Sequence, residues 1–327
     1  MTVPQNSPTD VLIIGGSHAG LSAALALYRS LHTSIIFDSG KPRNQFESAI
    51  HLTPTWENRS PVELRNASRH ELLATGLVSF VDAEIHEVTK TDDGTFRVTC
   101  ADGRSWLGKK VLLATGAADV FPDLPGYQDL YAKQMYVFTV WNVSLFLTYR
   151  RFPCMFQFGY ELRGSPSAGL LAIGSLANPM HALILAKDGY RFTERMTIYT
   201  NGNLELYGQL KKLITDGSGL SVDNREIAKL GQNEKGTALV HFKDGSQEEQ
   251  TFLVHRPSTK IDTKLTDQLG LKLSAMGEIE AAPPFCKTNV TGVYAAGDCA
   301  SMMKTISHAM MTGSYAACGI ARELPKI

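Results

Sequence analysis

Blocks of apolar residues alternate with polar and glycine-rich blocks along the chain, and this pattern predicts strands that lead into helices. The continuous apolar run Val11–Ile14 is typical of a strand buried in a parallel sheet. A glycine-rich turn follows it, and residues 19–28 are rich in small apolar side chains, which favours a closely packed helix. A second apolar run, residues 35–37, ends at Asp38. The start of the chain is therefore predicted to form a strand–helix–strand unit.

The same pattern returns later in the chain. An apolar strand is predicted before the sequence "ATG" at residues 114–116, and another before Gly297 and Asp298. Between them, residues 167–190 again alternate as strand, turn and helix, and "MTIYTNGN" at residues 196–203 is the next predicted strand. The long segment after Asp298 predicts a C-terminal helix.

The first turn carries the spacing Gly15-x-Ser17-x-x-Gly20. Gly15 permits a tight turn, Gly20 permits close packing of helix on strand, and Ser17 replaces the glycine at the point nearest a bound pyrophosphate. The helix then offers backbone N–H groups to phosphate. Asp38 follows by ~20 residues, where an acid binds a ribose hydroxyl. The alternative is an ordinary βαβ unit with a solvated Asp38.

Composition narrows the class of protein. A chain of 327 residues suggests about two domains. Lys and Arg total 32, as do Asp and Glu, so the net charge is zero and gives no reason to expect nucleic acid or an anionic membrane as partner. The first ten residues lack the basic and apolar regions of a signal peptide. Five cysteines do not make a disulfide framework. A reducing, cytoplasmic location and no metal site are expected.

With these motifs in place, the sequence resembles the two-dinucleotide-domain flavoproteins, in particular the low-molecular-weight thioredoxin reductases. Five stretches resemble the fungal gliotoxin-type dithiol oxidases of that group: "GGSHAGLSAALALYR", "DSGKPRN", "HLTPTWENRSPVELR", "FTERMTIYTNGN" and "GDCASMMKT". The resemblance implies an α/β fold of two Rossmann-like domains, the second inserted in the first. The FAD-binding domain would be residues 1–122 and 252–327, and the inserted NAD(P)-domain-like module residues 123–251.

The resemblance also implies a cofactor site and a substrate class. In this superfamily the aspartate at position 298 binds the ribityl chain of the flavin. His51 is a further expected contact, although a packed loop histidine is the alternative. The substrate would be a small thiol or disulfide, a sulfur-bridged diketopiperazine, and the protein a homodimer. The residues expected to bind FAD are Gly15, Gly16, Ser17, His18, Ala19, Gly20, Asp38, Ser39, Arg43, His51, Ala114, Thr115, Gly116, Asp298 and Ile306.

The inserted module departs from a working NADPH domain. Only Gly174 of the glycine pattern is kept, and Pro179 stands near the third glycine position. Leu176 occupies the position where backbone must approach a pyrophosphate, and we expect its side chain to block the phosphate. No arginine cluster follows Tyr199 to pair with a 2′-phosphate. We therefore expect a scaffold that has lost nicotinamide binding.

The redox motif of this group is also incomplete. The resemblance implies a C-x-x-C pair in which the first thiol reacts with the substrate and the second resolves the mixed disulfide beside the flavin. This chain has Cys154, but Gln157 replaces the second cysteine and Phe158 the following histidine. Three hypotheses follow: redox-neutral rearrangement of a substrate disulfide by Cys154, direct oxidation of substrate thiols by the flavin with dioxygen, or a catalytically silent protein. The first is favoured because Cys154 is kept.

Sulfur exchange needs a base, because the thiolate is the nucleophile. His308, early in the predicted C-terminal helix, is the candidate, with a packed helix histidine as the alternative. Cys299 follows Asp298 and is expected to be a packing residue. The remaining cysteines, Cys100, Cys286 and Cys318, are expected to be structural.

Overall fold

The computed structural model describes residues 8–46, 49–131, 135–136 and 160–324, and the chain divides into two compact units. The first unit contains residues 1–45, 62–118 and 260–327, and the second contains residues 46–61 and 119–259. The second unit is thus inserted in the first. It also includes residues 46–61, which the sequence analysis had placed with the first domain.

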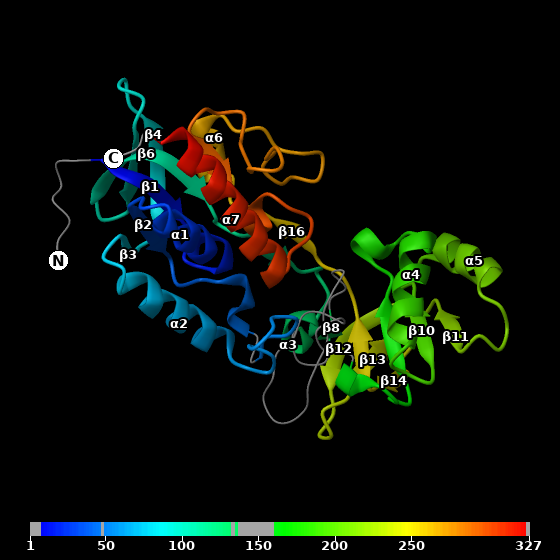
Figure 1. The fold of residues 1–327 in the computed structure, drawn as a ribbon. Coiled ribbons are helices and arrows are strands. Elements are labelled where there is room, and N and C mark those ends of the chain that lie inside the picture. The colour runs from blue at the N-terminus through cyan, green and yellow to red at the C-terminus, as the bar shows by residue number, and fades with distance from the viewer. Residues whose placement is uncertain (1–7, 47–48, 132–134, 137–159, 325–327) are drawn as a thin grey trace. The chain divides into compact units, whose positions relative to one another are not determined.

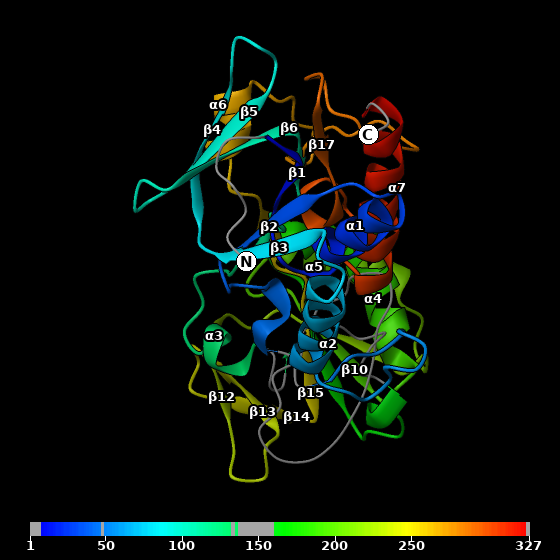
Figure 2. The ribbon, with the colours of Figure 1, turned by 60° about the vertical axis from the view of Figure 1, so that its left-hand side comes forward.

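The first unit is built on a mainly parallel sheet with the strand order β3-β2-β1-β6-β5-β4 among the described residues, in which β17 also pairs with β6 (Figure 1). The long strand β6 pairs with β5 along its first half and with β17 along its second. Strands β4 and β5 form an antiparallel hairpin at the sheet edge (Figure 2). The strands are β1 (Thr9–Ile14), β2 (Ser34–Asp38), β3 (Val78–Asp82), β4 (Ile85–Lys90), β5 (Phe96–Cys100), β6 (Ser105–Leu113) and β17 (Val293–Ala295).

Two helices of the first unit, α1 and α7, lie side by side against the sheet (Figure 1). They approach closely because small residues face one another: a Cβ atom added to Gly313 of α7 would lie 2.1 Å from the Ala19 carbonyl oxygen of α1. The other face of the sheet is covered by an apolar cluster that includes α6 residues. The helical segments are α1 (His18–Arg29), η1 (Arg43–Phe46), α2 (Pro61–Leu73), α6 (Lys264–Leu269), η4 (Gly297–Cys299) and α7 (Ile306–Glu323).

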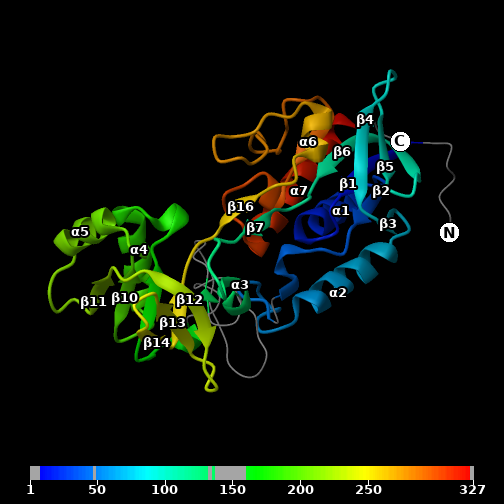
Figure 3. The same cartoon turned by 180° about the vertical axis from the view of Figure 1, so that it is seen from behind.

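The second unit is built on a parallel sheet with the order β11-β10-β9-β15-β8. Helices α4 and α5 pack on one face through one apolar cluster, and the antiparallel strands β12–β14 pack on the other through a second (Figure 3). The strands are β8 (Met135–Tyr136), β9 (Ala168–Leu171), β10 (Met196–Tyr199), β11 (Leu220–Asp223), β12 (Ile227–Gln232), β13 (Ala238–Phe242), β14 (Gln247–Gln250) and β15 (Phe252–Val254); the helical segments are α3 (Tyr127–Leu130), η2 (Tyr160–Leu162), η3 (Gly174–Leu176), α4 (Pro179–Tyr190) and α5 (Leu204–Leu213).

The chain passes between the units along two short strands, β7 (Ala118–Val120) and β16 (Ser258–Lys260), which pair with each other. Both units have a parallel sheet with strand–turn–helix connections, so the predicted α/β class with two Rossmann-like domains is confirmed. None of the helices in the described part of the chain is long and apolar enough to cross a membrane.

We predict that Gly313→Ala lowers the free energy of unfolding of the first unit by about 1–3 kcal/mol, because the added methyl group overpacks a contact with backbone that cannot rotate away. Urea unfolding followed by circular dichroism measures the change. Gly208→Ala is the matched control, since Gly208 lies in α5 and its added Cβ meets nothing within 4 Å. This control is expected to gain about 0.4–1 kcal/mol. Equal stability of the two variants would contradict the close α1–α7 contact.

Candidate functional site

The first turn has the backbone geometry of a phosphate cradle. Gly15 has a φ of 123°, and a Cβ atom there would lie 2.0 Å from the Ala114 carbonyl oxygen. A Cβ atom on Gly20 would lie 2.0 Å from the carbonyl oxygen of Gly15. Both positions therefore require glycine. The structure also brings this turn against the segment 114–116, another of the predicted cofactor motifs.

The helix that follows the turn begins with its N–H groups available. Ser17 is the N-cap residue of α1, and its side chain makes no capping hydrogen bond. The first N–H groups of a helix have no partner within the helix, so this end can donate to an anion. Asp38 lies beside the turn: a Cβ atom on Gly16 would be 2.5 Å from its carboxyl group. Ser39, the next residue, is exposed.

The Gly297–Asp298 motif lies in η4, immediately after β17. Asp298 Oδ2 is 3.3 Å from Arg43 Nη1, so two of the predicted cofactor residues meet although 255 positions separate them in sequence. Lys304, which the sequence analysis did not single out, holds this loop. Its buried ammonium group donates to the carbonyl oxygen of Asp298 at 3.0 Å and pairs with Glu278 at 3.5 Å.

His18, the first residue of α1, ends a chain of hydrogen bonds. Arg65 Nη1 donates to Asn44 Oδ1 at 2.8 Å, and Asn44 Nδ2 lies 3.4 Å from His18 Nε2. Because guanidinium and amide nitrogens only donate, His18 Nε2 must accept and the ring proton sits on Nδ1. Burial, together with the charge of Arg65, lowers the pKa of His18 to about 4. The ring is therefore a neutral group beside the turn.

The expected base, His308, is the third residue of α7. Its backbone N–H donates to the side chain of the N-cap residue Thr305 at 3.1 Å. Burial lowers the pKa of the imidazole, and the charge of Asp298 partly opposes this effect. His308 thus lies within the electrostatic reach of Asp298 as a neutral proton acceptor. Ile306, the first residue of the helix, is buried.

The corresponding turn of the second unit differs from the first, and one sequence-based expectation about it is wrong. Leu176 does not project into a phosphate site; its side chain is 2% exposed and packs in the apolar cluster beneath α4. The helix end is closed in another way. Asn178, the N-cap residue of α4, accepts hydrogen bonds from the N–H groups of Met180 and His181 at 3.0 and 3.2 Å. Pro179 at the first helical position has no N–H to donate.

The residues after β10 and β11 are also committed to protein contacts. Asn203 caps α5 by accepting from the N–H of Leu206 at 3.0 Å. Arg225, which follows β11, is paired with Asp223 and with Glu248. An arginine already neutralised by two carboxylates is a poor receptor for a 2′-phosphate. At this edge, the first N–H groups of α4 and the Arg225 side chain are thus used in contacts within the protein.

His51 lies in the second unit, in the segment 46–61. Its ring Nδ1 is 2.5 Å from Glu57 Oε1, and the side chain is 1% exposed. Cys154 and Gln157 lie outside the described residues. Of the other cysteines, Cys100, Cys286 and Cys299 are buried, as expected for packing residues. Cys318, which was also expected to be structural, is exposed on α7.

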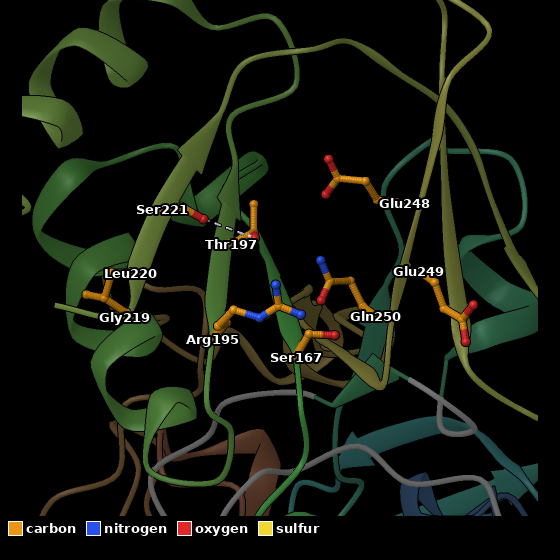
Figure 4. A pocket seen from close by; sticks show the side chains of 9 residues that line it. All are labelled: Ser167, Arg195, Thr197, Gly219, Leu220, Ser221, Glu248, Glu249 and Gln250. Carbon is orange, nitrogen blue, oxygen red and sulfur yellow. Dashed lines mark hydrogen bonds between the residues drawn. The ribbon is translucent and has the colours of Figure 1, made fainter. Parts of the chain in front are cut away.

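A cavity of about 520 Å³ lies in the second unit, at the amino ends of its parallel strands (Figure 4). In Figure 4 the side chains of Arg195, Gln250 and Ser167 point toward one another, and Ser221 donates to Thr197 at 3.1 Å. Ligands of open α/β sheets bind at the carboxyl ends of the strands, so this cavity lies at the opposite edge from a nucleotide site. Its lining residues are Ser167, Arg195, Thr197, Gly219, Leu220, Ser221, Glu248, Glu249 and Gln250.

The fold and the first turn define a protein of the dinucleotide-binding oxidoreductase class, and comparison with known proteins gives the family. Residues 9–143 and 209–313 match the model of the pyridine nucleotide-disulphide oxidoreductases, and the chain belongs to this family. Members of the family typically bind FAD. The residues of the first unit fit that cofactor, since the glycine cradle, the uncapped helix end and the Asp38 and Asp298 carboxylates lie in one unit.

Relatives in fungi place the chain among proteins of thioredoxin reductase type. It is 39% identical to thioredoxin reductase aclD of Aspergillus oryzae over 318 residues, which cover 96% of each chain. It is 36% identical to thioredoxin reductase sirT of Leptosphaeria maculans, over 95% of this chain and 93% of that protein. Among solved structures, an oxidoreductase from Agrobacterium tumefaciens superposes with a TM-score of 0.81 at 26% identity, over 97% of this chain and 98% of that one.

We predict that His18 titrates near pH 4, as its lowered pKa requires. Between about pH 6.5 and pH 4 the unfolded chain then binds a proton at this histidine that the folded chain does not, so stability falls as the pH drops through this range. Above about pH 7 the group has no effect. Proton–nitrogen correlation spectra of the ring, assigned with His18→Asn, measure the titration. A midpoint near 6.5 would contradict the buried, neutral ring.

Proposed function

We propose that this protein is an FAD-dependent sulfur oxidoreductase that acts on a sulfur-bridged diketopiperazine, promotes formation or rearrangement of its disulfide, and does not use NADPH. The observation that carries the proposal is the contrast between two helix ends. The N-cap residue Ser17 leaves the end of α1 open, whereas Asn178 closes the end of α4. One unit thus offers a cofactor site, and the other has a dinucleotide-domain fold without the open anion site.

FAD, when bound, supplies a reversible acceptor for two electrons. The α1 N-terminus would hold its pyrophosphate, Asp38 a ribose hydroxyl, and Asp298 the ribityl chain. Arg43 and Lys304 would keep the Asp298 loop in position, as they already contact it. The substrate class rests on the sequence resemblance to gliotoxin-type dithiol oxidases.

Cys154 is proposed to react with the substrate by thiol–disulfide exchange. Its thiolate attacks one sulfur of the substrate disulfide, an S–S bond to Cys154 forms, the substrate S–S bond breaks, and the second substrate sulfur leaves as a thiolate. After the sulfur-bearing carbon framework rearranges, that thiolate attacks the substrate sulfur held by Cys154 and releases the cysteine thiolate. Over the cycle two S–S bonds are broken and two are made, so no net oxidant is consumed. Gln157 cannot resolve the mixed disulfide, which leaves resolution to the substrate.

The second candidate is a dithiol oxidase that works directly through the flavin, and the position of His308 favours it. This neutral histidine lies near Asp298, in the unit that holds the cofactor residues. It would accept a proton from a substrate thiol there. The substrate dithiol would lose two electrons and two protons to form its disulfide, and dioxygen would take up both as hydrogen peroxide.

We predict that Cys154→Ser abolishes rearrangement while FAD stays bound, because a serine hydroxyl does not exchange with a disulfide. Gln157→Cys is expected to restore a resolving thiol and shift the product toward simple disulfide closure with oxygen consumption. Product analysis of both variants and the wild type on a disulfide diketopiperazine and on the matching dithiol, with oxygen uptake in parallel, measures the effect. An unchanged product from Cys154→Ser would exclude the lone-thiol mechanism and leave direct oxidation by the flavin.

A further inference from the structure

The segment 50–59 forms a closed loop around a histidine–carboxylate pair. Two backbone hydrogen bonds close the loop. The N–H of Ile50 donates to the carbonyl oxygen of Arg59 at 2.7 Å, and the N–H of Asn58 donates to the carbonyl oxygen of Ile50 at 2.8 Å. Inside it, His51 Nδ1 lies 2.5 Å from Glu57 Oε1, and Glu57 Oε2 accepts from the N–H of Leu52 at 2.9 Å. Both carboxylate oxygens are thus used, and the position of the carboxylate is fixed by the backbone.

The tautomer of His51 follows from these contacts. A carboxylate only accepts hydrogen bonds, so the proton of a neutral ring sits on Nδ1, facing Glu57. The basic lone pair is then on Nε2. This is the arrangement in which a carboxylate orients a histidine as a general base and stabilises the imidazolium that forms. The ring is 1% exposed and the carboxylate 52%, so the pair connects a water-excluded imidazole with solvent.

The backbone of this loop is strained. Leu52, Thr55 and Asn58 have φ values of 56°, 68° and 62°, in the left-handed region. A β-branched residue such as Thr55 rarely adopts this conformation. Each such residue costs of order 1–3 kcal/mol, and strain of this kind concentrates at functional sites. In addition, the buried hydroxyl of Thr53 has no hydrogen-bond partner among the described residues. A loop that only connected two elements would not need this cost.

The charges around the pair come from the same unit. The Glu57 carboxylate raises the pKa of Glu161 in η2, in addition to the larger effect of burial, which places the loop close to the segment 160–162. Arg59 lies over the ring of Trp56, with its guanidinium carbon 4.1 Å from the ring centroid. Among the described residues, Glu161 of η2 is thus a charged group close to Glu57, and Arg59 belongs to the same loop as the pair.

We infer that His51 is the general base of the thiol chemistry and that Glu57 is its positioning residue. The inference rests on the proposed function, and it gives His51 a role other than the cofactor contact expected from the sequence. In the step, the S–H bond of a substrate thiol breaks, the sulfur keeps the electron pair as a thiolate, and the proton forms an N–H bond at Nε2. As the dithiol loses two electrons and two protons to form its disulfide, dioxygen takes up the electrons, and the imidazolium gives its proton to the hydrogen peroxide that forms, so electrons and protons balance over the cycle.

The pKa of the thiol limits how much a general base can accelerate the reaction. A thiol with a pKa near 8.5 is about 3% ionised at pH 7 and about 90% ionised at pH 9.5. A base that ionises the thiol fully therefore accelerates the reaction by at most about thirtyfold at pH 7, and by very little at pH 9.5. His51→Asn is expected to lower kcat tenfold to thirtyfold at pH 7 and to approach wild-type kcat at pH 9.5, with KM little changed.

The variant Glu57→Gln distinguishes a role of Glu57 in orienting the His51 ring from a role in packing. Only one terminal atom of glutamine accepts a hydrogen bond; if it serves the N–H of Leu52, the amide NH₂ faces His51 Nδ1. The ring proton must then move to Nε2, and the basic lone pair is lost. The variant should show the same pH-dependent loss as His51→Asn. Two-bond proton–nitrogen correlation spectra should show Nδ1 protonated in the wild type and Nε2 protonated in the variant.

The experiment measures kcat and KM on a dithiol diketopiperazine at pH 7 and pH 9.5, with bound FAD quantified for every protein. His181→Asn and Glu194→Gln are matched controls, since both residues are exposed in the same unit, and should behave as the wild type. His308→Asn tests the rival base.

Loss at pH 7 that recovers at pH 9.5, with FAD retained, supports the inference. In His51→Asn, an equal loss of kcat at both pH values would mean that His51 has a structural role, and a loss of FAD would mean that it contacts the cofactor. Activity within threefold of wild type at pH 7 would mean that it has no role. Each of these three results overturns the inference. The same pH pattern in His308→Asn, without a loss in His51→Asn, assigns the base to His308. A wild type with no activity at either pH overturns the proposed function and the base role with it, whichever tautomer His51 shows.

Discussion

The first backbone N–H groups of a helix have no hydrogen-bond acceptor within the helix. The proposed function depends on which groups accept their hydrogen bonds in the two units. The two units share a parallel sheet and a strand–turn–helix connection, yet the turns end differently. At α1 the N-cap side chain makes no hydrogen bond, and the donors can serve a phosphate. At α4 the Asn178 carboxamide takes two of them and Pro179 removes another. The two helix ends thus differ in how their donors are used, and the proposed function depends on this difference.

The proposed cofactor site of the first unit is assembled by close packing. The small residues along α1 and α7 let the helices approach until a methyl group at Gly313 would clash with the carbonyl of Ala19. This contact places the middle of α7, at Gly313, against the start of α1, at Ala19. It also fits Gly297 against Ala19, because a Cβ atom on that glycine would lie 2.9 Å from the alanine side chain. Motifs almost 300 residues apart in sequence therefore share one site because their backbones pack without intervening side chains.

Much of this architecture could be predicted from the sequence. The apolar runs at β1, β2 and β9 and the glycine spacing at Gly15 fixed the local structure, since a buried parallel strand needs a continuous apolar run. The antiparallel strands β12–β14 were not predicted, because their alternating pattern is short and weak. The role of Leu176 was predicted wrongly: sequence gives the position of a side chain along the turn, but the direction in which it points depends on the helix that packs above it.

The polar contacts of the site were the least predictable part. Lys304 contacts Asp298 at its backbone carbonyl group, and Glu57 contacts His51 in a loop with three left-handed residues, so no spacing rule identifies either. The tautomers of His18 and His51 follow from hydrogen-bond partners that lie 26 and 6 positions away in sequence. Such pairs become visible only when the backbone is in place.

The central claim is that the first unit holds FAD while the second does not deliver electrons from NADPH. Rapid mixing of the flavin-loaded protein with NADPH under nitrogen, with the flavin absorbance near ~450 nm followed in time, tests it most directly. We expect the yellow colour to persist, with no reduction on the timescale of ordinary turnover, about one per second or faster. Bleaching of the flavin at such a rate would show that the capped end of α4 admits the nucleotide, and would contradict the account.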